Sequence, residues 1–247
     1  MDGTDPEGTE TLAPLARQLE AVGFRLLGGF HTDASCRAGE VDCDCPPAPG
    51  GGPAATLILV GNAGDALWCA FSAAPEACDG APDPLDRYTR RTLQPIARQA
   101  GLAAVFPFEK PWWPFQRWAL AAGGFSPSPM GVLAHHRYGP WAGFRAAFVS
   151  ASRLSDFPEN GSPGPCPTCA DKPCIAACPP GALSLAGYDV PACLAHLGEP
   201  AGTACLDGCL ARIACPFGEI YRHAPAQARF HMRAFAGWCD TSVNKGP

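Results

Sequence analysis

Residues 166–179 read CPTCADKPCIAACP, and this stretch decides how the C-terminal part of the chain is interpreted. It holds four cysteines, at Cys166, Cys169, Cys174 and Cys178, and a proline follows the last of them. Short cysteine spacings in a tight loop bring several thiolates into one small volume, as a metal centre with sulfur ligands requires. The stretch therefore predicts a cysteine-ligated metal centre.

Cysteine is unevenly distributed over the 247 residues. Of the 14 cysteines, five precede residue 160 and eight lie from Cys166 to Cys215, where Cys193, Cys205, Cys209 and Cys215 form a second group that again ends in Cys-Pro. A chain of this length can bury a sizeable core without disulfides or metal, so this concentration needs a chemical explanation. Because thiols stay reduced inside cells, we expect metal binding or redox chemistry rather than disulfides.

Composition and charge narrow the classes of function. Charged residues make up 17%, hydrophobic residues 47%, and the formal net charge is −5, which argues against disorder and against a surface that coats nucleic acid. No run of eighteen or more apolar residues occurs, and the chain begins with acidic rather than basic residues. We expect a soluble, cytoplasmic protein that binds neither nucleic acid nor membrane.

The part of the chain before the cysteine-rich stretch predicts alternating helices and strands. The apolar, β-branched run TLILV at 56–60 is the best central strand, and DPLD at 83–86 begins a long helix, with Asp83 as its N-cap and Gly101 as its stop. Further elements are expected as a helix over 12–22 and strands over 23–27, 103–108, 130–134 and 144–149. This alternation predicts an α/β or α+β layer architecture.

Residues 157–165, FPENGSPGP, consist largely of turn formers and predict a linker. We therefore predict an α+β domain over 1–158 with a loop at 31–53, a two-cluster module over 159–222, and a C-terminal helix and tail over 223–247. Cys69 and Cys78 are expected in the core of the first domain.

The cysteine-rich stretch resembles the dicluster ferredoxins of bacteria. Its spacing is C-x2-C-x4-C-x3-C-P, where that family has C-x2-C-x2-C-x3-C-P and the fourth cysteine ligates the other cluster. The resemblance implies a small ferredoxin-like module with two 4Fe-4S clusters. One cluster is expected on Cys166, Cys169, Cys174 and Cys215, and the other on Cys178, Cys193, Cys205 and Cys209.

The same stretch is similar to the C-terminal half of epoxyqueuosine reductases. The shared features are CIAACPPGA at 174–182, the isolated Cys193 in a leucine-containing segment, and the Cys209 to Cys215-Pro216 group. Structural zinc is the alternative, because four-thiolate zinc sites also use paired cysteines at short spacing. The two Cys-Pro endings favour iron-sulfur clusters.

The preceding part of the chain resembles the CblC cobalamin-processing proteins. The landmarks, in the same order, are GFRL at 23–26, TLILV at 56–60, DPLD at 83–86, GVLAH at 131–135 and RYGPWAGFR at 137–145. The resemblance implies a nitroreductase-like α+β fold whose cleft accepts a corrinoid such as cobalamin. It also implies that Arg145 takes the place of an arginine at the family's glutathione-binding site, with Trp141 as the accompanying aromatic residue.

Three hypotheses about function remain open at this point. In the first, the chain is a two-cluster electron carrier whose N-terminal domain docks a partner. In the second, it is a corrinoid reductase in which the clusters deliver electrons to a bound cobalamin. In the third, it is a structural zinc protein with an interaction role. The expected partner is a redox protein or a small-molecule electron acceptor. No nucleophile-base, phosphate-loop or dinucleotide motif is present, so no catalytic residue is predicted.

Overall fold

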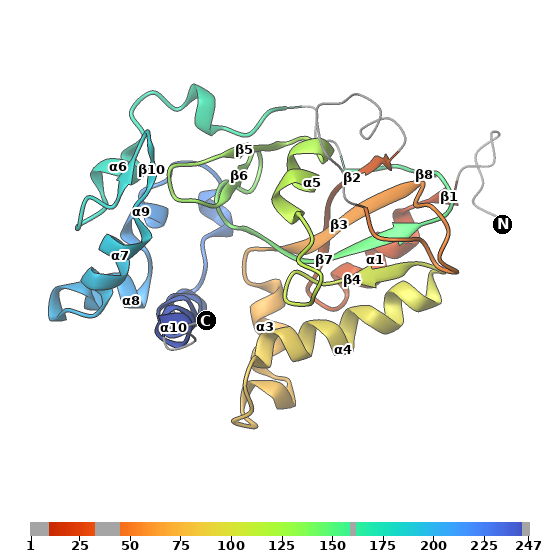
Figure 1. Ribbon diagram of the computed structural model, residues 1–247, viewed down its shortest axis with the longest axis horizontal. Helices are drawn as coiled ribbons and strands as arrows, with labels where there is room; N and C mark the ends of the chain where they lie inside the picture. Colours follow the sequence, from red (N-terminus) through yellow and green to blue (C-terminus); the bar gives the residue numbers. More distant parts are fainter. Residues whose placement is uncertain (1–9, 33–44, 159–161, 244–247) are drawn as a thin grey trace. The chain divides into compact units, whose positions relative to one another are not determined.

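Strand β3 (Thr56–Ala63) contains the predicted central strand and is buried along its whole length (Figure 1). The structure is a computed structural model that describes residues 10–32, 45–158 and 162–243. All eight residues of β3 are buried, as expected for a strand that is covered on both faces of its sheet. Cys36, Cys43 and the middle of the predicted linker lie outside the described residues.

The chain forms two compact units, and each is discontinuous in sequence. The body unit comprises Met1–Phe125 and Ala142–Pro163, and the cysteine unit comprises Ser126–Trp141 and Gly164–Pro247. The sequence places 126–141 in the N-terminal domain, whereas the structure groups this segment with the cysteines. The reason is a set of tertiary contacts, described below, that no local pattern shows.

The body unit is built on a sheet with the strand order β2-β3-β7-β4, and each neighbouring pair is antiparallel. A separate pair joins β1 and β8 in parallel. The strands are β1 (Glu10–Thr11), β2 (Arg25–His31), β3 (Thr56–Ala63), β4 (Ala103–Val105), β7 (Ala142–Ser150) and β8 (Leu154–Ser155).

Helices α1 (Ala13–Glu20) and α4 (Pro84–Gln99) pack against each other and against the sheet, and α5 (Phe115–Ala122) packs on β2. Helix α3 (Ala66–Ser72) follows β3. Asp83 is the N-cap residue and Pro84 occupies the first turn of α4, as predicted, but Asp83 adopts a left-handed conformation with φ of 51° and its side chain makes no cap hydrogen bond. An N-cap side chain reaches the first N–H groups from an extended backbone, which Asp83 does not have.

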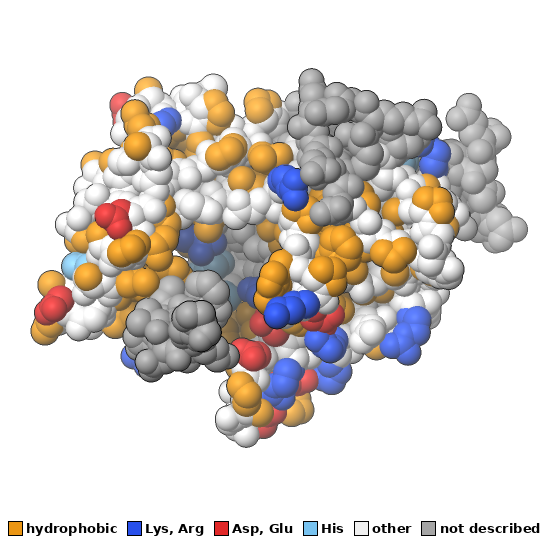
Figure 2. Space-filling view, viewed as in Figure 1, with side chains coloured by type: hydrophobic (Ala, Val, Ile, Leu, Met, Phe, Trp, Pro, Cys, Tyr) orange, Lys and Arg blue, Asp and Glu red, His pale blue; other side chains and the backbone are white. Residues whose placement is uncertain are grey.

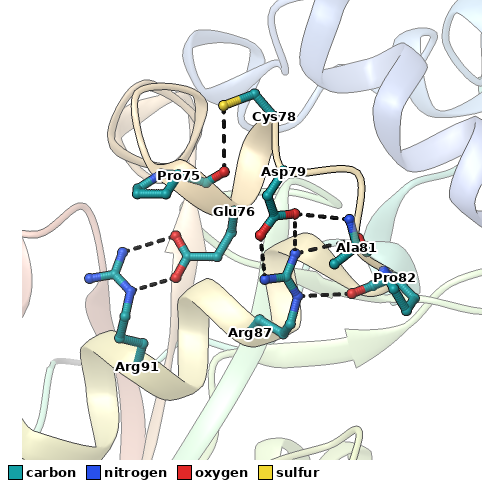
Figure 3. Close-up of polar contacts among 8 residues, drawn as sticks. All are labelled: Pro75, Glu76, Cys78, Asp79, Ala81, Pro82, Arg87 and Arg91. Atoms are coloured by element: carbon teal, nitrogen blue, oxygen red, sulfur yellow. Dashed lines mark hydrogen bonds and ion pairs between the residues drawn. The ribbon is translucent and has the colours of Figure 1, made fainter.

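Two carboxylates hold the segment before α4 to the exposed face of that helix (Figure 3). Arg87 pairs with both oxygens of Asp79 at 2.7 Å, and Arg91 pairs with Glu76 in the short 3-10 helix Pro75–Ala77. In Figure 2, Lys and Arg side chains gather over α4 together with acidic ones. The amphipathic pattern of α4 thus gives it a buried apolar face and a face of paired charges.

The prediction that Cys69 and Cys78 lie in the core is wrong, because both are exposed. Cys69 stands on α3, whose buried positions are Leu67 and Phe71. Residues at i and i+4 share one helix face, and position 69 lies between the two buried residues in sequence but on the opposite face.

The cysteine unit consists mainly of short helices, with two pairs of short strands, β5 with β6 and β9 with β10. Its elements are β5 (Phe125–Pro127), β6 (Leu133–His135), α6 (Pro173–Ala176), β9 (Leu183–Ser184), β10 (Gly187–Tyr188), α7 (Val190–Leu197), α8 (Thr203–Asp207), α9 (Leu210–Ile213) and α10 (Pro225–Val243), with 3-10 helices at Cys166–Thr168, Pro200–Gly202 and Glu219–Tyr221. The predicted C-terminal helix is present as α10, which packs on α8. None of the described helices combines the length and apolar character needed to cross a bilayer.

Candidate functional site

Four cysteines of the cysteine unit line one cavity. Cys166 and Cys169 flank a 3-10 turn, Cys174 lies in α6, and Cys215 follows α9. The cavity is small, with a volume of about 20 Å³, which is room for roughly one water molecule. The rest of its lining is formed by Pro129, Met130, Lys172, Pro173, Pro216 and Phe217. The structure therefore brings together the four residues of the first expected ligand set, including the one distant in sequence.

The electrostatics of these thiols agree with this grouping. Burial raises the pKa of the Cys215 thiol, and the neighbouring Cys166, Cys174 and Cys169 raise it further. Burial likewise raises the pKa of Cys166, while a hydrogen bond with the Ser126 hydroxyl opposes this rise. Each thiol of the group is thus close enough to influence the others.

Lys172 fixes the loop that carries the first two cysteines. Its Nζ donates hydrogen bonds to the carbonyl oxygens of Cys166 at 2.9 Å and of Cys169 at 2.8 Å. Lys172 has a φ of 38°, a conformation that side-chain-bearing residues rarely adopt, at the start of α6. The ammonium group therefore ties together the two ends of the turn from Cys166 to Cys169.

The second expected set, Cys178, Cys193, Cys205 and Cys209, also converges. Burial raises the pKa of the Cys205 thiol, and Cys193 and Cys178 raise it further. Burial also raises the pKa of Cys209, with Cys205 adding to it. The sequence separation between Cys178 and Cys205 is bridged by α7, which begins at the N-cap Asp189, whose Oδ1 accepts a hydrogen bond from Ala192 N at 3.0 Å.

Tyr188 lies among the cysteines of the second set. Its hydroxyl hydrogen-bonds to Cys193, and burial, followed by this bond and the nearby thiols, raises the pKa of the phenol. A small apolar core surrounds it, in which Cys174, Leu183 and Ala211 are buried and Met130, Ile175, Cys178, Tyr188 and Cys209 pack against them. Members of both cysteine sets thus share one apolar core.

Within the residues that the structure describes, no group of three or more His, Cys, Asp or Glu side chains is arranged to hold a single metal ion. A tetrahedral zinc site with Zn–S bonds of about 2.3 Å places its sulfurs roughly 3.8 Å apart. A cubane carries one thiolate on each of four irons, so its ligands surround a larger body. The donor chemistry of the first set, four thiols that line one small cavity, fits such a group.

In the body unit, Arg145 occupies a β-bulge of β7. Val60 pairs with Ala146 and Gly61 pairs with Phe144, so Arg145 is the extra residue between two registered pairs. A Cβ on Gly61 would lie 2.1 Å from Gly143 O, so this close approach of the two strands requires glycine. Bulges re-aim a side chain, and here Arg145 Nε donates to Asn62 Oδ1 at 3.1 Å.

Asp86 on α4 is the acidic neighbour of this arginine. Burial lowers the pKa of the Arg145 guanidinium, and the Asp86 carboxylate opposes that shift. Burial raises the pKa of Asp86 itself, with Arg145 lowering it and Asp83 raising it. Asp86 also lines a cavity of about 460 Å³ along α4, whose other residues are Asp83, Arg87, Arg90, Arg91, Gln94 and Phe108. The three arginines of this cavity are already paired with carboxylates.

Trp141, the other residue expected beside Arg145, belongs to the cysteine unit rather than the body unit. It is 3% exposed, and the guanidinium of Arg212 lies 4.9 Å from its ring centroid. Arg212 Nε donates to Pro140 O at 2.9 Å, and its charge lowers the pKa of the Cys209 thiol that burial raises. Sequence reasoning missed Arg212, although its position between Cys209 and Cys215 was a signal.

Sequence reasoning also missed Ser126 and Tyr188, the hydroxyl neighbours of the cysteines. Cys166 N donates to Ser126 Oγ at 3.2 Å, across 40 residues of sequence. This approach depends on Gly164, because a Cβ there would lie 2.2 Å from Ser126 N and 2.4 Å from Ala134 O. The sequence around Ser126 gives no signal of this contact. Tyr188 could have been found, because it lies between Cys178 and Cys193 in sequence.

Comparisons with known proteins place the fold. No protein-family model matches the chain, and no curated protein matches it by sequence, so the ferredoxin-like module and the likeness to epoxyqueuosine reductases stay predictions. Among solved structures, the chain is similar to a B12-trafficking protein of C. elegans, CblC, described as a homologue of human MMACHC. The TM-score is 0.51 at 14% sequence identity, over 91% of this chain and 93% of that one. The chain therefore has a CblC-like fold of mixed helices and sheet.

Proposed function

We propose that this chain is an iron-sulfur redox protein with two 4Fe-4S clusters, which passes electrons to a corrinoid held by the body unit. The observation that carries the proposal is the cavity that joins Cys215 to Cys166, Cys169 and Cys174. A cysteine from the second group in this position is the crossed arrangement of dicluster ferredoxins. The convergence of the other four cysteines supplies the second ligand set.

Bound at these cysteines, 4Fe-4S clusters supply one-electron transfer. The chain's own residues supply the surroundings. Lys172 holds the loop of the first set, and apolar side chains, among them Met130 and Ile175, exclude water between the sets. Burial and hydrogen bonding to sulfur are the features by which a protein sets a cluster's potential.

The corrinoid part of the proposal is supported by the CblC-like fold, since the similar structure is that of a B12-trafficking protein. We further propose that Arg145 takes part in binding on the body unit. The bulge presents a partly buried guanidinium held by Asn62, and Asp86 balances its charge.

The test begins with protein purified without oxygen. We expect about eight irons and eight acid-labile sulfides per chain, with broad absorption near about 400 nm that bleaches on reduction. A colourless protein loaded with zinc would overturn the proposal and favour the structural alternative.

Cobalamin is then titrated into the iron-loaded protein. We expect a spectral shift of the corrinoid with a Kd in the micromolar range or tighter, which corresponds to a binding free energy of about −8 kcal/mol or more negative. Arg145→Gln, which keeps a hydrogen-bonding side chain but removes the charge, is expected to weaken binding at least about tenfold. Iron without any corrinoid shift would leave the chain as an electron carrier.

A further inference from the structure

Each cysteine set has one hydroxyl group within hydrogen-bonding reach of a sulfur. Ser126 reaches Cys166 of the first set, and Tyr188 reaches Cys193 of the second. We propose that Ser126 and Tyr188 are positioning residues that donate hydrogen bonds to ligand sulfurs and thereby set the potentials of the two clusters separately. This inference rests on the proposed function and goes beyond it, because it assigns the residues that make the two clusters different.

The geometry at Ser126 leaves its hydroxyl proton available to the sulfur of Cys166. The backbone N–H of Cys166 donates to Ser126 Oγ at 3.2 Å, so this oxygen acts as the acceptor of that bond. The hydroxyl proton then points elsewhere, and the side chain of Cys166 is the hydrogen-bond partner present. Ser126 is 4% exposed, so water does not compete freely for the proton.

The position of Ser126 is fixed from both sides. Gly164 lacks the Cβ that would collide with Ser126 N and Oγ, and Cys166 follows two residues later. Ser126 lies in β5, which pairs with β6 of the same sheet. The hydroxyl is therefore held on a strand beside the first cysteine, rather than on a mobile loop.

Tyr188 is fixed by packing instead. It ends the short strand β10, whose pairing with β9 sets Tyr188 opposite Leu183. A Cβ on Gly131 would lie 3.1 Å from Tyr188 Cδ1, so the ring lies flush against that backbone. The ring packs with Cys178 and Cys209 on the same apolar core, which directs the hydroxyl toward Cys193.

A hydrogen bond to a ligand sulfur stabilises the more negative, reduced form of a cluster. Removing the donor therefore makes the cluster harder to reduce. Since the two donors belong to different sets, each substitution is expected to move one potential and leave the other in place.

The experiment is a redox titration followed by electron paramagnetic resonance of the iron-loaded wild type, Ser126→Ala and Tyr188→Phe. We expect the wild type to show two transitions, Ser126→Ala to shift one to more negative potential, and Tyr188→Phe to shift the other. Cys215→Ala and Cys205→Ala, each expected to retain one cluster, identify which transition belongs to which set.

Two matched controls lie in the same unit. Ser128 Oγ donates within its own turn to Val132 O at 2.7 Å, and Tyr221 Oη accepts from Arg137 Nε at 3.1 Å. Ser128→Ala and Tyr221→Phe should leave both potentials at their wild-type values. Ser126→Thr, which keeps the hydroxyl, should restore the first potential toward that of the wild type.

The outcomes separate the two proposals. A wild type without iron overturns both. A wild type with about eight irons whose potentials are unmoved by Ser126→Ala and Tyr188→Phe overturns this inference alone. If Ser126→Ala or Tyr188→Phe loses the cluster beside it, 3-fluorotyrosine at position 188 provides the test. Its phenol is a stronger hydrogen-bond donor with nearly the same ring shape. A shift of the second cluster to more positive potential supports the inference, and an unchanged potential overturns it.

Discussion

Cys215 and Cys166 line one cavity, although they stand at opposite ends of the cysteine-rich stretch of sequence. Cys215 follows α9, and all four cysteines of the other set lie between it and Cys174 in sequence. The grouping of ligands is consequently a property of the fold, and pairs of substitutions are a direct way to read it.

Replacing two cysteines of one set should lower the iron content by the same amount as replacing one of them. We expect Cys166→Ala with Cys215→Ala to retain about four irons per chain, whereas Cys166→Ala with Cys205→Ala should retain almost none. Iron and sulfide analysis of anaerobically purified proteins measures this. The exposed Cys69, changed to Ala, serves as the control and should leave about eight irons. The opposite ranking of the two double variants would mean that the sets are partitioned differently.

Gly164→Ala should disturb the first cysteine set selectively. The added Cβ would lie 2.2 Å from Ser126 N, so the strand that carries Ser126 has to move. Overpacking of this kind costs roughly 1–3 kcal/mol. We expect a lower midpoint of unfolding and loss of up to half of the iron. Gly52→Ala is the matched control, because its Cβ would meet nothing within 4 Å; equal losses in both variants would count against the contact.

Arg212→Lys should destabilise the cysteine unit despite keeping the charge. A lysine cannot reproduce the two guanidinium bonds to Pro140 O or the stacking on Trp141, which together are worth about 1–3 kcal/mol. Tryptophan fluorescence during denaturant unfolding reports this loss. Arg229→Lys, whose arginine forms an exposed pair with Asp207 at 2.8 Å, should stay near the wild type. Similar midpoints for the two lysine variants would rule out a special role of Arg212.

The Glu76–Arg91 pair makes the body unit less stable in acid. The hydrogen bonds from Arg91, at 2.5 and 3.0 Å, lower the pKa of Glu76 from its ordinary 4.5, outweighing the effect of burial. The pair therefore stabilises the fold fully above about pH 5 and loses this contribution as the pH falls through the lowered pKa.

Unfolding of wild type and Glu76→Gln across pH measures this effect. We expect the wild type to be more stable at neutral pH by up to about 1 kcal/mol, and the difference to vanish toward about pH 3. Asp79→Asn is the comparison, since both side chains of the Asp79–Arg87 pair are 37% exposed and water screens them more. A difference that grows in acid would contradict the assignment.

The sequence predicted the elements whose signal is local. The run at 56–60 is the core of β3, and the helix begun at Pro84 ends at Gln99, just before the predicted stop at Gly101. The CblC-like fold agrees with landmarks spread over the body. The expected grouping of the cysteines came from the resemblance to dicluster ferredoxins, in which the fourth cysteine of a motif ligates the other cluster.

What the sequence did not predict depends on pairing between distant segments. The bulge at Arg145 exists because β3 and β7 change register between Val60 and Gly61, and only the paired strands show it. The contact of Ser126 with Cys166 depends on the missing Cβ of Gly164. The burial of cysteine was mispredicted at Cys69 because an average preference does not say which face of a helix a residue occupies.

The discontinuity of the two units has a consequence for synthesis of the protein. Ser126–Trp141 leaves the ribosome before the last strand of the body's sheet and before any of the eight clustered cysteines. This segment has to wait until Gly164 and Cys166, which contact Ser126, have been translated, at about 5–20 residues per second. Expressing the chain from Gly164 onward as a separate fragment would omit it, so the eight clustered cysteines would have to fold without the strand that carries Ser126.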